Sequence, residues 1–255
     1  MAFENATGKK FAAANNRQGT TQLSAKGSED LGGGLTASFN IEQDFVSVNN
    51  AGLTGGEAFV GLAGSFGSIK LGAPNTPTLS SQASRQPFGT KLGGGFSGAL
   101  GTGHVRNSGS FVYAAPAMGG VTVALGYTPE TTAAKAITDL GLTYASGALK
   151  VLFTQYKQAT TQNNLAVQYD LGAAVVYAGA SNETGKDSSS NLAVKVPMGA
   201  LSLLGNYATM GDDKTTAVGV SYALSKRTST YARYVDVKAS GASTKTTLVG
   251  VQHNF

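Results

Sequence analysis

The chain has 255 residues, of which only 13% are charged and 35 are glycine; the charged share is about half, and the glycine share roughly double, the values usual in soluble domains. No stretch approaches the roughly 18 apolar residues of a transmembrane helix, and the absence of cysteine excludes a disulfide scaffold. The net charge of +5 does not indicate a nucleic-acid partner, because lysine and arginine occur singly or in pairs. Few helix formers, with much Gly, Thr, Ser and Tyr, favour an all-β chain.

At the N-terminus the sequence predicts no signal peptide, because Met1 is followed by Ala-Phe-Glu-Asn, with neither a basic nor an apolar region. The chain is then cytosolic, or a mature or incomplete form. Further along, apolar residues alternate with polar or small ones, and a period of two is typical of strands. The pattern predicts about sixteen strands, at residues 1–5 (a fragment), 19–30, 35–46, 57–66, 68–75, 104–115, 121–128, 135–146, 148–158, 163–171, 173–183, 188–198, 201–210, 214–224, 228–237 and 246–255.

The connections between these strands alternate in kind. One set is tight, as at residues 66–68 and 145–147, and the intervening set is longer and polar, as at 158–163 and 182–190. Alternate turns of an up-and-down meander lie at the same end, so one rim would carry short turns and the other long loops, as in outer-membrane barrels. Strands of about 9–11 residues can also cross a bilayer at a tilt. The sequence therefore predicts an all-β fold, a transmembrane antiparallel up-and-down β-barrel.

One connection differs from all others. Residues 76–103 are rich in glycine and have no strand pattern, and connections of this length are generally functional or disordered. A barrel of about sixteen strands encloses more space than side chains can fill. We expect residues 76–103 to fold into the lumen and narrow it, within a single barrel domain of residues 1–255.

Several long motifs resemble those of the Gram-negative general porins, in particular the β-proteobacterial type. They occur in the family's order and extend over essentially the whole chain: residues 26–35 (KGSEDLGGGL), 58–62 (AFVGL), 66–68 (FGS), 222–229 (YALSKRTS) and 249–255 (VGVQHNF). The resemblance implies a sixteen-stranded homotrimeric porin of the cell outer membrane, surrounded by lipid and lipopolysaccharide, with its third external loop in the lumen. The terminal Phe255 is similar to the signal that outer-membrane assembly machinery recognises.

The N-terminus departs from that family pattern. Members begin with a complete strand, whereas residues 1–4 look like the second half of one. We therefore expect the first strand to be incomplete.

Parity along each strand assigns side chains to the two faces of the wall. The side chains expected to face lipid are Leu23, Leu140, Leu142, Tyr144, Val167, Tyr169, Val194, Val218, Val220, Tyr222, Val249, Val251 and Phe255. Tyr and Phe must supply the interfacial girdle, because the chain contains no Trp.

The same parity places charged side chains inside the lumen, where they avoid the cost of about 2–4 kcal/mol for a basic side chain in mid-bilayer. Lys26, Lys70, Arg106 and Arg233 are inward on their strands, Arg85 and Lys91 lie in the long loop, and Glu42 and Asp139 are inward carboxylates. Lysine or arginine rings select anions in pores, so this set predicts a basic constriction led by Arg106. The alternative is that these residues are solvated lumen side chains that select nothing.

The predicted function is a water-filled channel for passive diffusion of small hydrophilic solutes, with anions preferred. We expect no enzyme, cofactor or metal site: residues 93–98 match a dinucleotide fingerprint in letters only, without a βαβ unit, and His104 and His253 lie on different strands. Two other classes stay open. They are a non-porin outer-membrane barrel, either a substrate-specific transporter or an adhesin, and, least favoured, a soluble all-β surface protein.

Overall fold

A computed structural model describes residues 1–49, 51–95, 98–101 and 103–255. The described residues form one 17-stranded antiparallel sheet with two short helices. The strands are β1 (Ala2–Ala6), β2 (Ala12–Ala14), β3 (Gln22–Gly32), β4 (Leu35–Val46), β5 (Ala51–Gly64), β6 (Gly67–Ala73), β7 (Ser110–Ala114), β8 (Val121–Thr128), β9 (Ile137–Ser146), β10 (Leu149–Lys157), β11 (Thr161–Asp170), β12 (Val175–Glu183), β13 (Ser189–Met198), β14 (Leu201–Met210), β15 (Asp213–Ala223), β16 (Thr228–Ala239) and β17 (Ala242–His253). The helices are α1 (Pro77–Ser84) and the 3₁₀ turn η1 (Gly98–Leu100); neither is long and apolar enough to cross a membrane.

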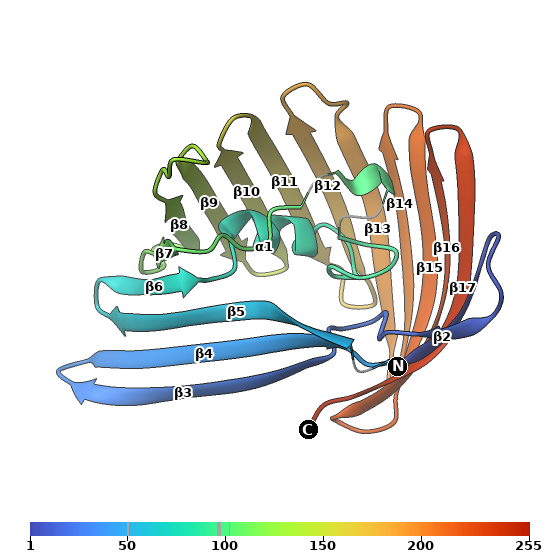
Figure 1. Cartoon of the computed structure of the whole chain (residues 1–255), viewed down its shortest axis with the longest axis horizontal. Coiled ribbons are helices and arrows are strands. Elements are labelled where there is room, and N and C mark those ends of the chain that lie inside the picture. The colour runs from blue at the N-terminus through green and yellow to red at the C-terminus, as the bar shows by residue number, and fades with distance from the viewer. Residues whose placement is uncertain (50, 96–97, 102) are drawn as a thin grey trace.

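Each strand from β3 to β17 pairs with its neighbours in the chain, and β17 also pairs with β1, which in turn pairs with β2. The sheet curves around α1, which lies on its concave side (Figure 1). The predicted antiparallel barrel with a long loop folded inward is therefore confirmed. Its N-terminal part differs from the prediction, because β2 is an additional short strand and β3 begins at Gln22.

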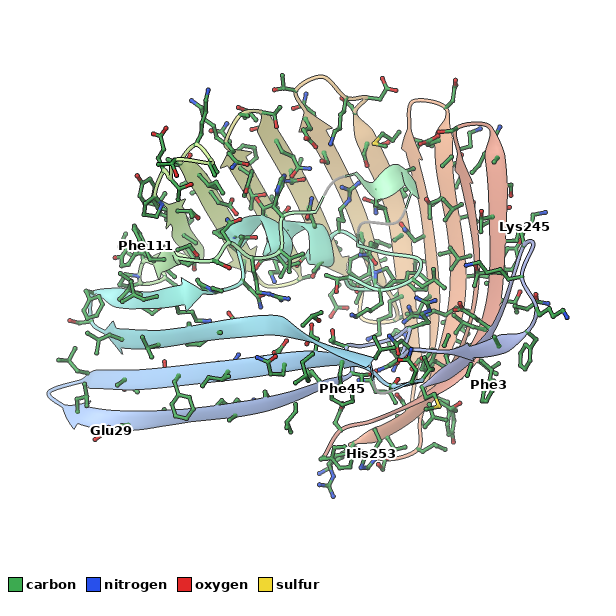
Figure 2. The ribbon with its side chains drawn as sticks, in the orientation of Figure 1. Phe3, Glu29, Phe45, Phe111, Lys245 and His253 are labelled. Carbon is green, nitrogen blue, oxygen red and sulfur yellow. The ribbon has the colours of Figure 1, made fainter. Side chains whose placement is uncertain are left out.

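The outer face of the wall is apolar and the inner face is small or polar. On β15, Val218 is 51% exposed, whereas the neighbouring Ala217 is 1% exposed. The outer face also carries Phe3 and Phe111 (Figure 2). The predicted lipid-facing residues Leu140 and Tyr144 are likewise exposed, which confirms the predicted register.

The strand predicted at residues 104–115 is wrong in its first half. The structure keeps only β7, Ser110–Ala114, and Arg106 forms an isolated bridge with Asn75. The cause is local: Gly109 has a positive φ of 65°, and the Ser110 hydroxyl donates to the carbonyl of Asn107 at 2.6 Å. This turn interrupts the extended backbone.

Candidate pore constriction

The constriction loop, residues 76–103, begins with the capped helix α1. Residues 96, 97 and 102 of the loop lie outside the described residues. Thr76 is the N-cap of α1, and its hydroxyl accepts from the Leu79 amide at 3.1 Å, while Pro77 occupies the first turn. The carboxylate of Asp139 on β9 accepts from the amide and the hydroxyl of Thr78, at 2.9 and 2.8 Å. The N-terminal end of α1 is therefore fixed to the inner wall.

The other end of α1 is held by Arg85. Its guanidinium donates to Asn191 Oδ1 at 2.6 Å, to Ser189 Oγ at 2.7 Å and to the Leu100 carbonyl at 3.3 Å. Arg85 is 0% exposed, and among the described residues no carboxylate forms a salt bridge with it. Burial lowers the pKa of Arg85 to about 10, so the side chain stays charged at neutral pH. Arg85 therefore holds the loop to β13 and does not face the open channel.

Two glycines of the wall, Gly141 and Gly179, lie directly beneath the loop. A Cβ added at Gly141 would lie 2.8 Å from the Pro77 Cβ, and one at Gly179 would lie 2.6 Å from the Arg85 Cβ. Both glycines face inward, since the atoms nearest to their Cβ positions include Pro77 Cβ and Arg85 Cβ of the loop. These positions leave the loop backbone room to lie directly on the sheet.

The tip of the loop reaches β16. Phe88 is 2% exposed and packs with Ala217 and Val235. The guanidinium of Arg233 lies 5.1 Å from the Phe88 ring centroid and donates to the Leu92 carbonyl at 2.7 Å. Arg233 is 4% exposed, so this second predicted pore residue is also buried between loop and wall.

On the opposite wall, β3 to β6 carry charged side chains around a hollow of about 600 Å³. Lys26 and Lys70 line it together with Glu42 and Glu57. Lys70 Nζ lies 3.4 Å from Glu57 Oε1. The basic side chains on this wall are therefore mixed with carboxylates.

The loop tip and this wall approach each other at Lys91. Burial lowers the pKa of Lys91, Asp44 and Glu42 oppose that shift, and Arg106 and Arg17 add to it. Lys91 is therefore within electrostatic range of four charged groups on three other segments. Arg106 itself lies 4.0 Å from Asp44 and donates to the Asn75 side chain at 3.2 Å. We call these five side chains, which interact electrostatically near the tip of the loop, the eyelet.

The structure thus divides the predicted site residues into three groups. Lys91 interacts electrostatically with Arg106 and Glu42 at the eyelet, and Lys26 and Lys70 lie on the wall beside it. Arg85 and Arg233 are buried supports, because their guanidinium groups find backbone and amide acceptors behind the loop.

Two eyelet residues were not among the predicted site residues. Asp44 has the same inward parity as Glu42, a signal that could have identified it. Arg17 lies in a segment without periodicity, and no pattern in the sequence places it; its guanidinium binds Glu4 at 2.9 and 2.8 Å. The described residues contain no group of three or more His, Asp or Glu side chains that could hold a metal ion.

Comparison with known proteins identifies the chain's family. Residues 2–242 match the family model of the Gram-negative porins. The outer membrane porin protein 32 of Delftia acidovorans is 27% identical over 92% of this chain and 81% of its own length. A shorter match, 56% identical, covers 18% of this chain and 13% of the major outer membrane protein P.IA of Neisseria meningitidis serogroup C.

Solved structures agree on the fold. The anion-selective porin from Comamonas acidovorans superposes with a TM-score of 0.87 at 22% identity, over 100% of this chain and 96% of that one. OmpT of Vibrio cholerae, solved in a trimer form, gives a TM-score of 0.75 at 12% identity, over 99% and 96% of the two chains. With a family match along almost its full length, this chain belongs to the Gram-negative porins and is a β-barrel porin of the outer membrane.

Proposed function

We propose that the chain forms a water-filled channel through which small hydrophilic solutes diffuse passively, with a modest preference for anions. The observation that carries the proposal is the eyelet, in which three cations outnumber two carboxylates: Lys91, Arg106 and Arg17 against Asp44 and Glu42. The low-dielectric wall of a narrow channel focuses the field of such groups. The whole chain acts as one barrel domain, with residues 76–103 as its constriction loop.

The preference is modest because three of the basic side chains near the constriction lie beside carboxylates. Lys70 lies beside Glu57, Arg106 beside Asp44, and Arg17 binds Glu4. Lys91 forms no salt bridge within the described part of the chain. The positive excess at the eyelet therefore depends on Lys91 and on the buried Arg233 behind it.

The assembly is proposed to be a homotrimer in outer-membrane lipid and lipopolysaccharide. The trimer form of the Vibrio cholerae porin with the same fold supports this assembly. Analytical ultracentrifugation of the detergent-extracted protein should give three times the chain mass, and a monomeric mass would contradict the proposal.

Selectivity is tested by reversal potentials in a salt gradient across a planar bilayer. Arg106→Glu should move the reversal potential towards cations, because it replaces the guanidinium that lies 4.0 Å from Asp44 with a carboxylate. Combining it with Lys70→Glu should move it further. Lys214→Glu makes the same charge change at an exposed position near the start of β15 and serves as the control. If neither Arg106→Glu nor the double variant moves the reversal potential beyond the control, the proposed basis of selectivity is wrong.

A further inference from the structure

A second segment, besides the constriction loop, lies inside the barrel. Residues 15–21 connect β2 to β3 and run along the inner face of the wall. The Gln18 amide donates to Ser229 Oγ at 2.8 Å, and the Ser221 hydroxyl donates to Gln18 Oε1 at 3.2 Å. Ser221 on β15 pairs with Tyr231 on β16, and Ser229 has the same parity as Tyr231. Both serines therefore lie on the inward face, since Val220 and Tyr222 on either side of Ser221 are apolar and point outward.

The same segment also reaches the wall that carries the acidic side of the eyelet. Asn15 Oδ1 accepts from the Ser47 amide at 2.8 Å, just after β4, and the Thr21 carbonyl accepts from Phe45 at 3.0 Å. Residues 15–21 therefore bridge the inner faces of β15 and β16 to the end of β4. This path places Arg17 beside the lumen.

One side chain joins this segment to the constriction loop. Arg233 Nη1 donates to the Arg17 carbonyl at 2.6 Å and to the Leu92 carbonyl at 2.7 Å. Its guanidinium lies 5.1 Å from the Phe88 ring centroid and 5.5 Å from that of Tyr231. Tyr231 adds another tie, because its hydroxyl accepts from the Arg17 amide at 2.8 Å.

We propose that residues 15–21 are a second constriction element and that Arg233 is the positioning residue that sets the channel's bore, by fixing this element to the loop tip. The proposal rests on the channel function above. The two carbonyls that Arg233 binds belong to Arg17 itself and to the neighbour of Lys91, so the same contact sets the separation of two eyelet cations. The ligand class is unchanged: small hydrated anions that pass these cations.

The chemistry of arginine suits this position. A guanidinium is planar, presents several donors in a fixed fork and stacks on aromatic rings. A lysine ammonium at residue 233 would keep the charge, but it lacks the flat surface that lies against Phe88 and Tyr231. Glutamine would keep one amide donor group and remove the charge.

The test is single-channel conductance of the reconstituted porin with Arg233→Gln. Release of the two inward segments should widen the bore and raise the conductance about 1.5-fold, since conduction follows pore diameter. The open-current distribution should broaden as well. Arg227→Gln, at an exposed turn before β16, is the matched control and should conduct like the unmodified porin. Folded Arg233→Gln channels of unchanged conductance would overturn the proposal.

A disulfide provides the rescue, because the chain has no cysteine of its own. Gln18→Cys with Ser229→Cys places one thiol on the segment and one on the wall, where the native Gln18 Nε2 and Ser229 Oγ lie 2.8 Å apart. In the Arg233→Gln background, the oxidised pair should restore the original conductance, and reduction should remove that rescue. A pair that oxidises fully without restoring conductance would show that residues 15–21 do not narrow the channel.

If Arg233→Gln does not fold, Arg17→Cys in the otherwise unmodified porin tests whether residues 15–21 border the bore. A charged methanethiosulfonate reagent should lower the current if residue 17 borders the bore, and an unchanged current in labelled channels would refute the proposal. Conductance reports the bore, whereas reversal potential reports selectivity. An unchanged reversal potential in Arg106→Glu would therefore contradict the proposed selectivity without affecting the interpretation of the Arg233→Gln conductance.

Discussion

The wall of the barrel and the segments inside it are built by different interactions. From β9 to β17 the strands span 9 to 12 residues and pair continuously with their neighbours. The constriction loop and residues 15–21 have almost no ladder of their own and are positioned by side-chain hydrogen bonds from Asp139, Arg85 and Arg233. The comparison teaches that main-chain pairing and lipid fix the wall, whereas a few polar side chains fix the channel. Each can be disturbed separately.

The largest effect is expected from a charge on the outer face. Val218→Lys places an ammonium where Val218 is 51% exposed on the lipid side of β15. The free energy of unfolding should fall by about 2–4 kcal/mol if the residue lies near the bilayer midplane. Urea titration of folding into lipid vesicles measures it.

The control is Ser202→Lys on the inner face of β14, where water can solvate the ammonium. Ser202 pairs with Ser221, which also faces inward. Its unfolding free energy should change by less than about 1 kcal/mol. Equal losses in the two variants would contradict the assigned faces.

A smaller effect is expected at the start of the loop. Thr78→Val keeps the side-chain shape but removes the hydroxyl that donates to Asp139 at 2.8 Å. A buried carboxylate oxygen then loses its donor, which costs about 1–3 kcal/mol. The loss should appear as excess open-channel noise and faster proteolysis within residues 76–103. Thr132→Val, at an exposed loop position, is the control; similar noise in both variants would show that Asp139 does not hold α1.

The smallest effect is a pH dependence of selectivity. Lys91 is charged below its pKa, and burial lowers that pKa from the ordinary value of 10.5. As the pH rises through the lowered pKa, the eyelet loses a positive charge. The reversal potential should therefore move towards cations at a lower pH than that at which an exposed lysine loses its charge. Lys91→Arg should abolish this movement, because a guanidinium stays protonated. A shift that persists in Lys91→Arg would assign the titration to another group.

The strands of the wall could be predicted because apolar residues, which face lipid, alternate in the sequence with polar or small residues, which face the lumen. Val218 and Ala217 show this alternation, and the register of β15 follows from it. The segments inside the barrel have no such alternation. Arg85 was predicted as a pore residue because it lies in the long loop, which contains no Asp or Glu, and Arg233 because parity places it inside. Neither signal distinguishes a side chain in water from one buried between loop and wall.

Arg17 shows the other limit of the prediction. Its position depends on contacts with Tyr231 and Arg233, more than 200 residues away along the chain. No local pattern records such a contact. The basic constriction formed with the loop stays a prediction from the sequence, and the contacts of the N-terminal segment come from the structure alone.

The glycines behind the loop have a consequence for how such a channel can change. Because Gly141 and Gly179 are in contact range of Pro77 and Arg85, a single added methyl group there would displace the loop towards the channel axis. Neither glycine touches a passing solute. A substitution at either glycine would therefore change the size limit for solutes from a position that no solute contacts. Related porins could differ in permeability although all the residues that face the channel water were identical.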